Sequence, residues 1–293
     1  MRAESMRRGV VSRARRLSGA ALLLFIVLGA GARAGQSGDE EKDQFAAAAS
    51  YLQVAVEGMH VRLEGGANPE AHRLQPTPLL KYSDPARGYL AAGLWRLGKA
   101  GRPKGFVSAE YWAPNTDNPS DQPFVSFEFI PLSDQPFELA GRRAELKWTW
   151  DGSGTRPIVL PEAPAPAASP RQRLVQMRNI VRRLDVKEIY RENPIALRLM
   201  TQPVDRYEDR ERGIVDGAAF LFAHGTNPEI LVLLECTNQR WQLCILRMSW
   251  AESFVELDGR EIVRFPEIRE HPTAGPYQTA GYGLPGQLDL KAP

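Results

Sequence analysis

A carboxylate, a histidine and a serine in the second half of the chain are the residues whose types could do acid–base chemistry. They are Asp216, His224 and Ser249. An imidazole can transfer protons near neutral pH, a carboxylate can orient it, and a hydroxyl can act as the nucleophile of a hydrolase. Such groups meet only in the folded chain, so their spacing neither builds nor excludes a site. An extracytoplasmic hydrolase is therefore kept as an alternative hypothesis.

Motifs that mark a specific chemistry are missing from the sequence. The histidines show no metal-ligand spacing among themselves or with the cysteines: His60, His72, His224 and His271. A Gly-x-Ser-x-Gly elbow, a phosphate loop and a dinucleotide fingerprint do not occur. Residues 115–121 could offer oxygen ligands to calcium, but they lack the Gly and the distal Glu of an EF-hand and are typical of a turn. We expect no metal and no cofactor, assign no catalytic residue, and keep His224 and Asp216 as candidate binding residues.

Two tryptophans could bind a ligand by stacking. Trp148 and Trp150 are two residues apart, so on a strand their side chains share a face. If exposed, the indoles could stack on sugar rings, which makes a carbohydrate-binding module a further alternative. If buried, they fill a core, and we prefer this interpretation because large aromatic side chains dominate protein cores.

A string with tyrosine, aspartate and arginine occurs twice, 125 residues apart. Both copies read Pro-x3-Tyr-x-Asp-x2-Arg-Gly, and their polar members are Tyr82, Asp84, Arg87, Tyr207, Asp209 and Arg212. An Asp and an Arg three residues apart could pair and present the phenol as a site. Turn formation explains the string better, because Asp can accept a backbone hydrogen bond two residues on and Gly eases entry into the next strand. We expect this motif to be structural.

The string lies within a longer internal repeat. Residues 73–110 align with residues 198–235 without a gap, and ten of the 38 pairs are identical, whereas average composition would give roughly two or three. Residues 139–142 then match residues 257–260 at an offset of 118, so the first copy holds seven extra residues, most economically within 113–122. This pattern describes a duplicated structural unit. Two such small units would be more stable packed together than apart.

The N-terminus predicts export. Six arginines precede an apolar run over residues 20–28 and the triplet Ala32-Arg33-Ala34, which is the order of a secretory signal peptide. The run is shorter than the about 20 apolar residues that a membrane span needs. We expect cleavage after Ala34, with an uncleaved membrane anchor as the alternative. Residues 1–34 contain seven Arg and one Glu, so the remainder has 30 basic and 34 acidic residues and a net charge near −4, against +2 for the whole chain. This charge gives no support for nucleic-acid binding.

Helical periodicity precedes each copy of the repeat. An apolar stripe within residues 40–58 predicts a first helix, and its members are Phe45, Ala48, Leu52 and Val56. A second helix is expected to begin with Ser169 as the N-cap and Pro170 at the first position. Its apolar residues recur at steps of three and four: Leu174, Met177, Val181 and Leu184.

Short apolar runs separated by Gly and Pro predict strands in both copies. They are residues 87–97, 105–112, 123–132 and 144–150, then 217–223, 229–236, 241–248, 254–257 and 260–265, the last two around the hairpin signal Asp258-Gly259. Five prolines predict an extended linker, and a Gly- and Pro-rich end predicts a loosely ordered tail. The chain divides into a signal peptide (1–34), a first unit (35–151), a linker (152–170), a second unit (171–267) and a tail (268–293).

The two cysteines, Cys236 and Cys244, could form a disulfide in an exported chain. If residues 229–236 and 241–248 pair across a four-residue turn, Cys244 lies opposite Leu233. Bridging needs Cα atoms within about 7 Å, which this register does not provide. The alternatives are a disulfide and two buried thiols in neighbouring strands, and the register favours the thiols.

Several short strings in the second half resemble one group of proteins. They are Leu197-Arg198-Leu199, Gln202-Pro203, Arg206-Tyr207, Asp216-Gly217-Ala218 and the run from Phe222 to Glu229. On these strings the chain resembles uncharacterised exported proteins of planctomycete bacteria with an internally duplicated helix-plus-β unit. The likeness covers mainly residues 170–250 and, more loosely, residues 75–112. The resemblance implies export and a repeated architecture, and it supplies neither a function nor a catalytic residue.

Taken together, the sequence predicts an α+β protein with two related antiparallel β-rich units, each preceded by a helix and packed pseudo-symmetrically. Duplication without a convergent acid, base and nucleophile favours an exported, non-catalytic binding or interaction protein, periplasmic or extracellular. Its partner is unknown, with a cell-envelope protein or a polysaccharide as suitable classes and no nucleic acid expected. Contact with a membrane is expected only if the signal is uncleaved.

Overall fold

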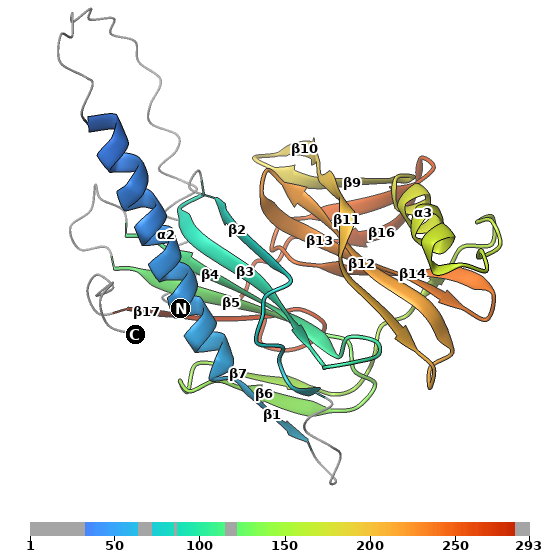
Figure 1. Cartoon of the computed structure of the whole chain (residues 1–293), viewed down its shortest axis with the longest axis horizontal. Helices are drawn as coiled ribbons and strands as arrows, with labels where there is room; N and C mark the ends of the chain where they lie inside the picture. Colours follow the sequence, from blue (N-terminus) through green and yellow to red (C-terminus); the bar gives the residue numbers. More distant parts are fainter. Residues whose placement is uncertain (1–32, 64–71, 85–86, 115–121, 285–293) are drawn as a thin grey trace, which may run out of the picture.

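The computed structural model describes residues 33–63, 72–84, 87–114 and 122–284. In these ranges the chain is rich in strands, which form antiparallel sheets accompanied by two helices (Figure 1). This confirms the expected β-rich fold, in which antiparallel sheets are combined with helices. Nearly all of the expected signal peptide, and the calcium-loop candidate at residues 115–121, lie outside the described residues.

The first half has a helix and a strand before its main sheet. These are α2 (Arg33–Glu57) and β1 (His60–Leu63), and a meander follows with β2 (Leu80–Asp84), β3 (Tyr89–Leu97), β4 (Gly105–Trp112) and β5 (Phe124–Pro131). A hairpin of β6 (Phe137–Ala140) and β7 (Lys147–Trp150) comes next. The hairpin pairs with β1, and the meander is extended at the β5 edge by β17 (Gln278–Gly283). The strand orders are β1-β6-β7 and β17-β5-β4-β3-β2.

The second half shows a similar succession of elements, with one additional short strand. It begins with α3 (Pro170–Val181), β9 (Leu184–Tyr190) and the short β10 (Asn193–Ala196), followed by a meander of β11 (Arg198–Asp209), β12 (Ile214–His224), β13 (Asn227–Thr237) and β14 (Arg240–Arg247). The hairpin of β15 (Ser253–Leu257) and β16 (Arg260–Phe265) pairs with β9. The strand orders are β10-β9-β15-β16 and β11-β12-β13-β14-β8.

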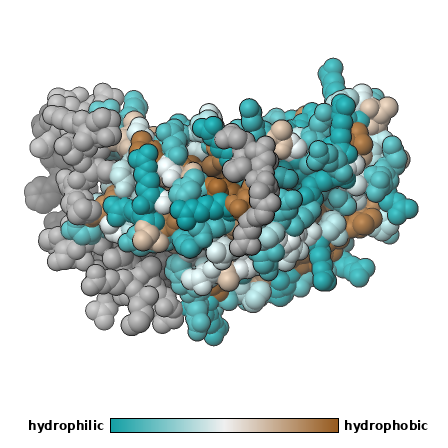
Figure 2. Space-filling model, turned by 90° about the horizontal axis from the view of Figure 1, so that it is seen from below, coloured by the Kyte–Doolittle hydropathy of each residue, from teal (hydrophilic) through white to brown (hydrophobic). Residues whose placement is uncertain are grey.

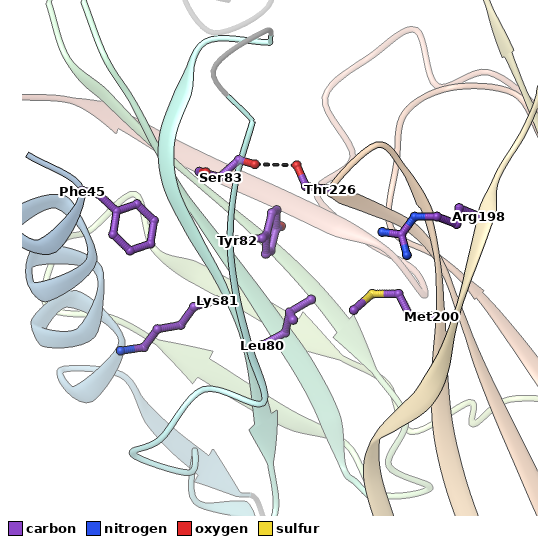
Figure 3. Close-up of a pocket in the computed structure, with 8 residues that line it drawn as sticks. All are labelled: Phe45, Leu80, Lys81, Tyr82, Ser83, Arg198, Met200 and Thr226. Atoms are coloured by element: carbon purple, nitrogen blue, oxygen red, sulfur yellow. Dashed lines mark hydrogen bonds between the residues drawn. The ribbon is translucent and has the colours of Figure 1, made fainter. Parts of the chain in front are cut away.

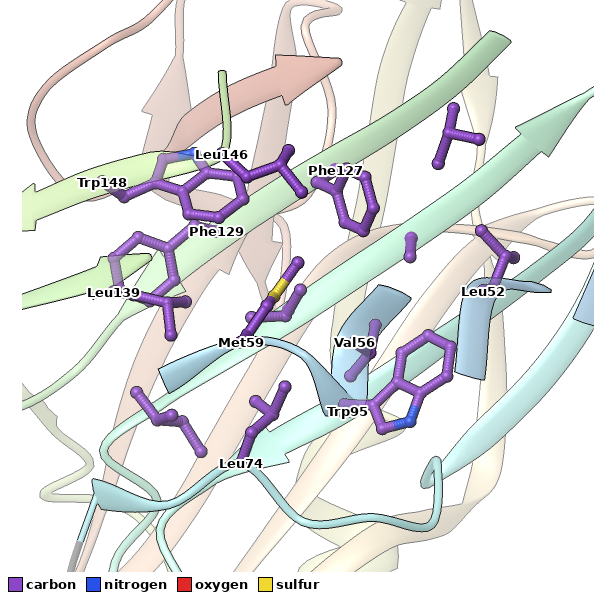
Figure 4. Close-up of a cluster of buried hydrophobic side chains, with 14 of the residues drawn as sticks. Leu52, Val56, Met59, Leu74, Trp95, Phe127, Phe129, Leu139, Leu146 and Trp148 are labelled. Atoms are coloured by element: carbon purple, nitrogen blue, oxygen red, sulfur yellow. The ribbon is translucent and has the colours of Figure 1, made fainter. Parts of the chain in front are cut away.

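Both helices form close to where the sequence predicts them, because each buries one apolar stripe, but Leu184, expected on the second helix, begins β9. Ala48, Leu52 and Val56 of α2 are buried against β3 and β4, where Figure 4 shows Leu52 and Val56 beside Trp95. At the start of α3, the Ser169 hydroxyl accepts a hydrogen bond from the backbone N–H of Gln172 at 3.3 Å, and Pro170 occupies the first turn. Neither helix is long and apolar enough to cross a membrane, within the residues described.

The two large sheets pack face to face through a central hydrophobic cluster. The first sheet contributes Leu94, Phe106 and Ile130, and the second contributes Leu221 and Leu231, among others. The opposite face of the first sheet is covered by α2 and the β1-β6-β7 sheet, and that of the second by α3 and the sheet containing β9. Alternate residues of the meander strands therefore face two different cores, as the period of two requires.

The segment expected to be a loose tail contains a paired strand. Residues 268–293 are expected from the sequence to be loosely ordered, but β17 pairs antiparallel with β5 along its whole length. Tyr277 and Tyr282 are buried, and a Cβ on Gly281 would lie 2.4 Å from the Phe124 ring and 2.7 Å from the Val125 carbonyl oxygen. The sequence did not predict this strand because the segment has few apolar residues. Two tyrosines and a glycine are nevertheless enough to pack it against the edge of the sheet.

The expected linker is also partly a strand. β8 (Ile158–Val159) pairs with β14, and the Trp241 indole N–H donates to the Pro164 carbonyl at 3.0 Å. The prolines keep the segment extended, and this shape lets it lie on the edge of the second sheet. The segment therefore belongs to the second half rather than only joining the halves.

The pairing of β13 with β14 follows the predicted register. Leu233 lies opposite Cys244, and Cys236 lies opposite Trp241. Both cysteines are free and buried, so the disulfide alternative is wrong. The two thiols belong to different cores: Cys236 lies in the cluster beneath α3, and Cys244 lies in the central cluster between the sheets.

Candidate functional site

The repeated tyrosine, aspartate and arginine string forms the same turn in both halves. The backbone N–H of Arg87 donates to Asp84 Oδ1 at 3.3 Å, and that of Arg212 donates to Asp209 Oδ1 at 3.2 Å. The following glycines adopt the left-handed backbone region, with φ of +98° at Gly88 and +67° at Gly213. These positions therefore form turns, as expected from the sequence, although each Asp accepts from the backbone three residues on and not two.

The arginines of these turns also form ion pairs with acidic residues of the other half of the chain. The sequence did not indicate these pairs. Arg87 forms ion pairs with Glu229 and, at 3.4 Å, with Glu188, and it contacts His224 Nδ1. Arg212 pairs with Asp134 in the opposite direction. We call the boundary between the two halves the seam. The partners of Arg87 lie more than 100 positions along the chain, so no local pattern could have indicated them.

A second buried network lies along the seam around Glu235. Arg102, from the β3–β4 turn, donates through Nε to Glu235 Oε1 at 2.8 Å, and the Tyr207 hydroxyl donates to the same oxygen at 2.7 Å. Arg102 Nη2 lies 3.3 Å from Cys244 Sγ. In the first half, the Tyr82 hydroxyl instead contacts the Ser108 hydroxyl at 3.0 Å. The repeated tyrosines are both buried, and each completes an internal polar contact.

The cluster around Arg87 holds more acid than base. Burial and the neighbouring Glu188 raise the pKa of Glu229 to about 7, although Arg87 opposes the shift. Burial also raises the pKa of Glu188, while burial and the Arg87 charge lower the pKa of His224. Asn227 donates to Glu229 at 2.7 Å, and the Ser249 hydroxyl also hydrogen-bonds to it. The arrangement can hold a proton on a buried carboxyl near neutral pH.

The structure does not bring together the acid, histidine and serine of the alternative hydrolase hypothesis. Asp216 and His224 lie near opposite ends of β12, eight residues apart, and at about 3.3 Å per residue this separation is roughly 26 Å. Asp216 is instead bound by Arg173 at 2.9 Å and, through both of its oxygens, by Arg206. The convergence of Asp216 with His224 that the alternative hydrolase hypothesis requires therefore does not occur. Ser249 and His224 do reach the same cluster, through Glu229 and Glu188.

Trp148 and Trp150 are buried, at 2% and 4% exposure. The Trp148 ring packs 6.0 Å from that of Phe129, and Trp150 Nε1 donates to the Ser133 carbonyl at 2.6 Å. Both belong to the core beneath α2, as preferred from the sequence. Buried indoles cannot stack on a sugar ring, so Trp148 and Trp150 do not support the carbohydrate-binding alternative.

A cavity of about 380 Å³ lies on the seam, beside the Arg87 cluster. We call it the seam groove. Leu80 of β2 and Met200 of β11 lie opposite each other across it, with Arg198 next to Met200 (Figure 3). The Thr226 hydroxyl, two residues beyond His224, donates to the Ser83 carbonyl. The groove is lined by Phe45, Leu80, Lys81, Tyr82, Ser83, Arg198, Met200 and Thr226.

Sequence reasoning did not identify the groove residues as a site. Tyr82 and Arg198 were noted only as members of the repeat, and β2 was not predicted, since Pro78 and a length of five residues give a weak strand signal. The alternation of Arg198, Leu199 and Met200 was the available signal, because it places a cation and a flexible apolar side chain on one face.

Comparisons with protein-family models, with curated proteins and with solved structures give no match to this chain. The described ranges contain no group of three or more histidine, cysteine or acidic side chains that could hold a metal ion. On the face shown in Figure 2, hydrophobic residues form small patches among hydrophilic ones. The seam groove is the cavity that we consider as a binding site.

Proposed function

We propose that this protein is an exported, non-catalytic binding protein, and that its ligand occupies the seam groove. The observation that carries the proposal is the lining of the groove. Phe45, Leu80 and Met200 provide apolar walls, while Lys81 and Arg198 are exposed cations with no carboxylate partner among the described residues. A ligand with an apolar body and a negative charge fits this combination.

The succession of elements supports a duplication as the origin of the seam. In each half a helix and a strand precede a four-stranded meander and a hairpin, with the short β10 added in the second half, and the repeated residues form similar turns. We infer that two copies of one unit pack pseudo-symmetrically and that the groove arose between them. Binding sites are common at boundaries between structural units, because a cavity can form there without disrupting the core of either unit.

The separation of Asp216 from His224 favours binding over hydrolysis. A hydrolase of the expected type needs the acid, the imidazole and the hydroxyl within hydrogen-bond reach of one another. Asp216 is fully engaged by two arginines at the far end of the strand. The groove itself combines apolar side chains with cations, which orient a ligand without reacting with it.

The fluorescent probe 8-anilinonaphthalene-1-sulfonate tests this proposal, since it joins apolar rings to a sulfonate. We expect one probe molecule to bind per chain, with affinity that falls as salt is added. Arg198→Gln should weaken binding about threefold to fivefold, the size of an exposed ion pair, and Met200→Trp should abolish it by filling the groove. Arg171→Gln, an exposed arginine on α3, is the matched control. Equal binding to all four proteins, each with native circular dichroism, would refute the assignment.

A further inference from the structure

The seam groove lies along the open edge of a strand. Four consecutive residues of β2 line it, from Leu80 to Ser83. Successive side chains of a strand point to opposite faces, so a cavity touching all four cannot lie on one face of the sheet. It must lie at the edge, and β2 is the last strand in the order β17-β5-β4-β3-β2.

One face of a second strand forms the other wall of the groove, since Arg198 and Met200 are two residues apart. Arg198 and Met200 belong to β11, which is the last strand of its own sheet. Among the described strands, β2 pairs with β3 and β11 pairs with β12, and the two do not pair with each other. The Thr226 contact to Ser83 closes one end of the space between them. The groove is thus a slot between the open edge of β2 and one face of β11.

The side chains around the slot specify what could enter it. Leu80 and Met200 offer apolar contacts between the strands, and Phe45 of α2 adds an aromatic ring on the other flank of β2 (Figure 3). Lys81 and Arg198 add positive charge on the two sides of β2. An extended chain with alternating apolar and acidic side chains would match this pattern, since its own period is also two.

Building on the proposed function, we propose that the natural ligand is an extended segment of a partner protein, which adds to β2 as a further strand. The backbone of the segment bonds to the β2 edge, which binds an extended peptide through main-chain hydrogen bonds. Its apolar side chains contact Leu80 and Met200, and its acidic side chains face Lys81 and Arg198. Strand addition also explains why the polar edge of β2 lies in a sheltered slot and not on an open surface.

The probe is a peptide from a random nonapeptide display library. The library is selected for binding to the full chain and counter-selected against binding to the Lys81→Gln, Arg198→Gln double variant. We expect enrichment of peptides with Asp or Glu alternating with apolar residues. A selected peptide should displace 8-anilinonaphthalene-1-sulfonate and slow hydrogen exchange at Leu80 to Tyr82. Arg171→Gln should bind it as the native chain does, and Arg198→Gln should bind it several-fold more weakly.

N-methylation of the peptide distinguishes strand addition from other modes. A strand bonds to its neighbour through the amides of alternate residues. Methylating one alternate set should therefore weaken binding at least tenfold, while methylating the other set should change it little. Equal effects of the two sets, or enrichment of no peptide while the fluorescent probe still binds, would overturn strand addition and leave the proposed function standing. Loss of both probe and peptide binding to the groove would overturn both.

Discussion

At the scale of single residues, the seam depends on arginines that reach buried acids of the other half. Arg87 reaches Glu229 and Glu188, and Arg102 reaches Glu235, which is 1% exposed. The turn roles of the repeated residues followed from the sequence, because Asp and Gly act within a few positions. The acids that the arginines meet did not, because a partner more than 100 residues away leaves no local pattern.

Glu229→Gln should change how stability depends on pH. The folded pKa of Glu229 lies near 7, above its usual 4.5, so the folded state holds more protons than the unfolded state between these values. The native chain should therefore lose stability as pH rises through this window, by about 1–3 kcal/mol from this group. The variant should lack that loss. Urea unfolding at pH 5 and pH 8 would measure it, and parallel pH profiles would contradict the assignment.

Arg102→Met should destabilise the fold strongly. The change leaves the Glu235 carboxylate buried with the Tyr207 hydroxyl and without its cation, and breaking a buried ion pair in this way costs about 3–5 kcal/mol. The Arg102→Met, Glu235→Gln double variant also removes the unpaired buried charge, so it should recover part of the lost unfolding free energy. Urea unfolding of the two single variants and the double variant completes the cycle. Additive losses would show that the pair is not coupled.

At the scale of elements, β17 is a strand whose removal should be informative. Ending the chain after Gly275 removes Tyr277 and Tyr282 from the core and takes a hydroxyl donor from the buried Glu128. We expect a loss of about 3–5 kcal/mol and self-association through the newly open β5 edge. Thermal unfolding and sedimentation velocity measure the two effects. A chain ending after Leu284 keeps β17 and serves as the control; equal behaviour of both would contradict the role of the strand.

Long elements were predictable from the sequence, and short ones paired across distant segments were not. The meander strands β3, β4, β12 and β13 are each eight or more residues long and mostly buried, and both helices carry a clear stripe. By contrast, β8 has two residues and β1 has four, and β17 pairs with a strand about 150 positions earlier. Such strands exist because an edge is available, a condition that the rest of the molecule sets. The groove was missed for a related reason, since β2 is only five residues long, although it pairs with the next strand, β3.

At the scale of the whole molecule, the two halves should unfold together. Each main sheet has one face in the central cluster, so separating the halves exposes apolar side chains such as Phe106 and Leu231. We expect residues 33–151 and 152–284 to be unstable when produced alone. The full chain should show one calorimetric transition, with a calorimetric enthalpy equal to the van't Hoff enthalpy. Two resolved transitions would show that the halves are independent.

The placement of the two thiols gives the molecule a pair of internal reporters. Cys236 and Cys244 lie on opposite faces of one sheet, the first under α3 and the second between the main sheets. A buried thiol reacts with an alkylating reagent only when its surroundings open. In variants keeping one cysteine at a time, the alkylation rate at residue 244 would follow breathing of the seam, and the rate at residue 236 would follow lifting of the helix. Motion at the binding site could thus be timed separately from motion elsewhere.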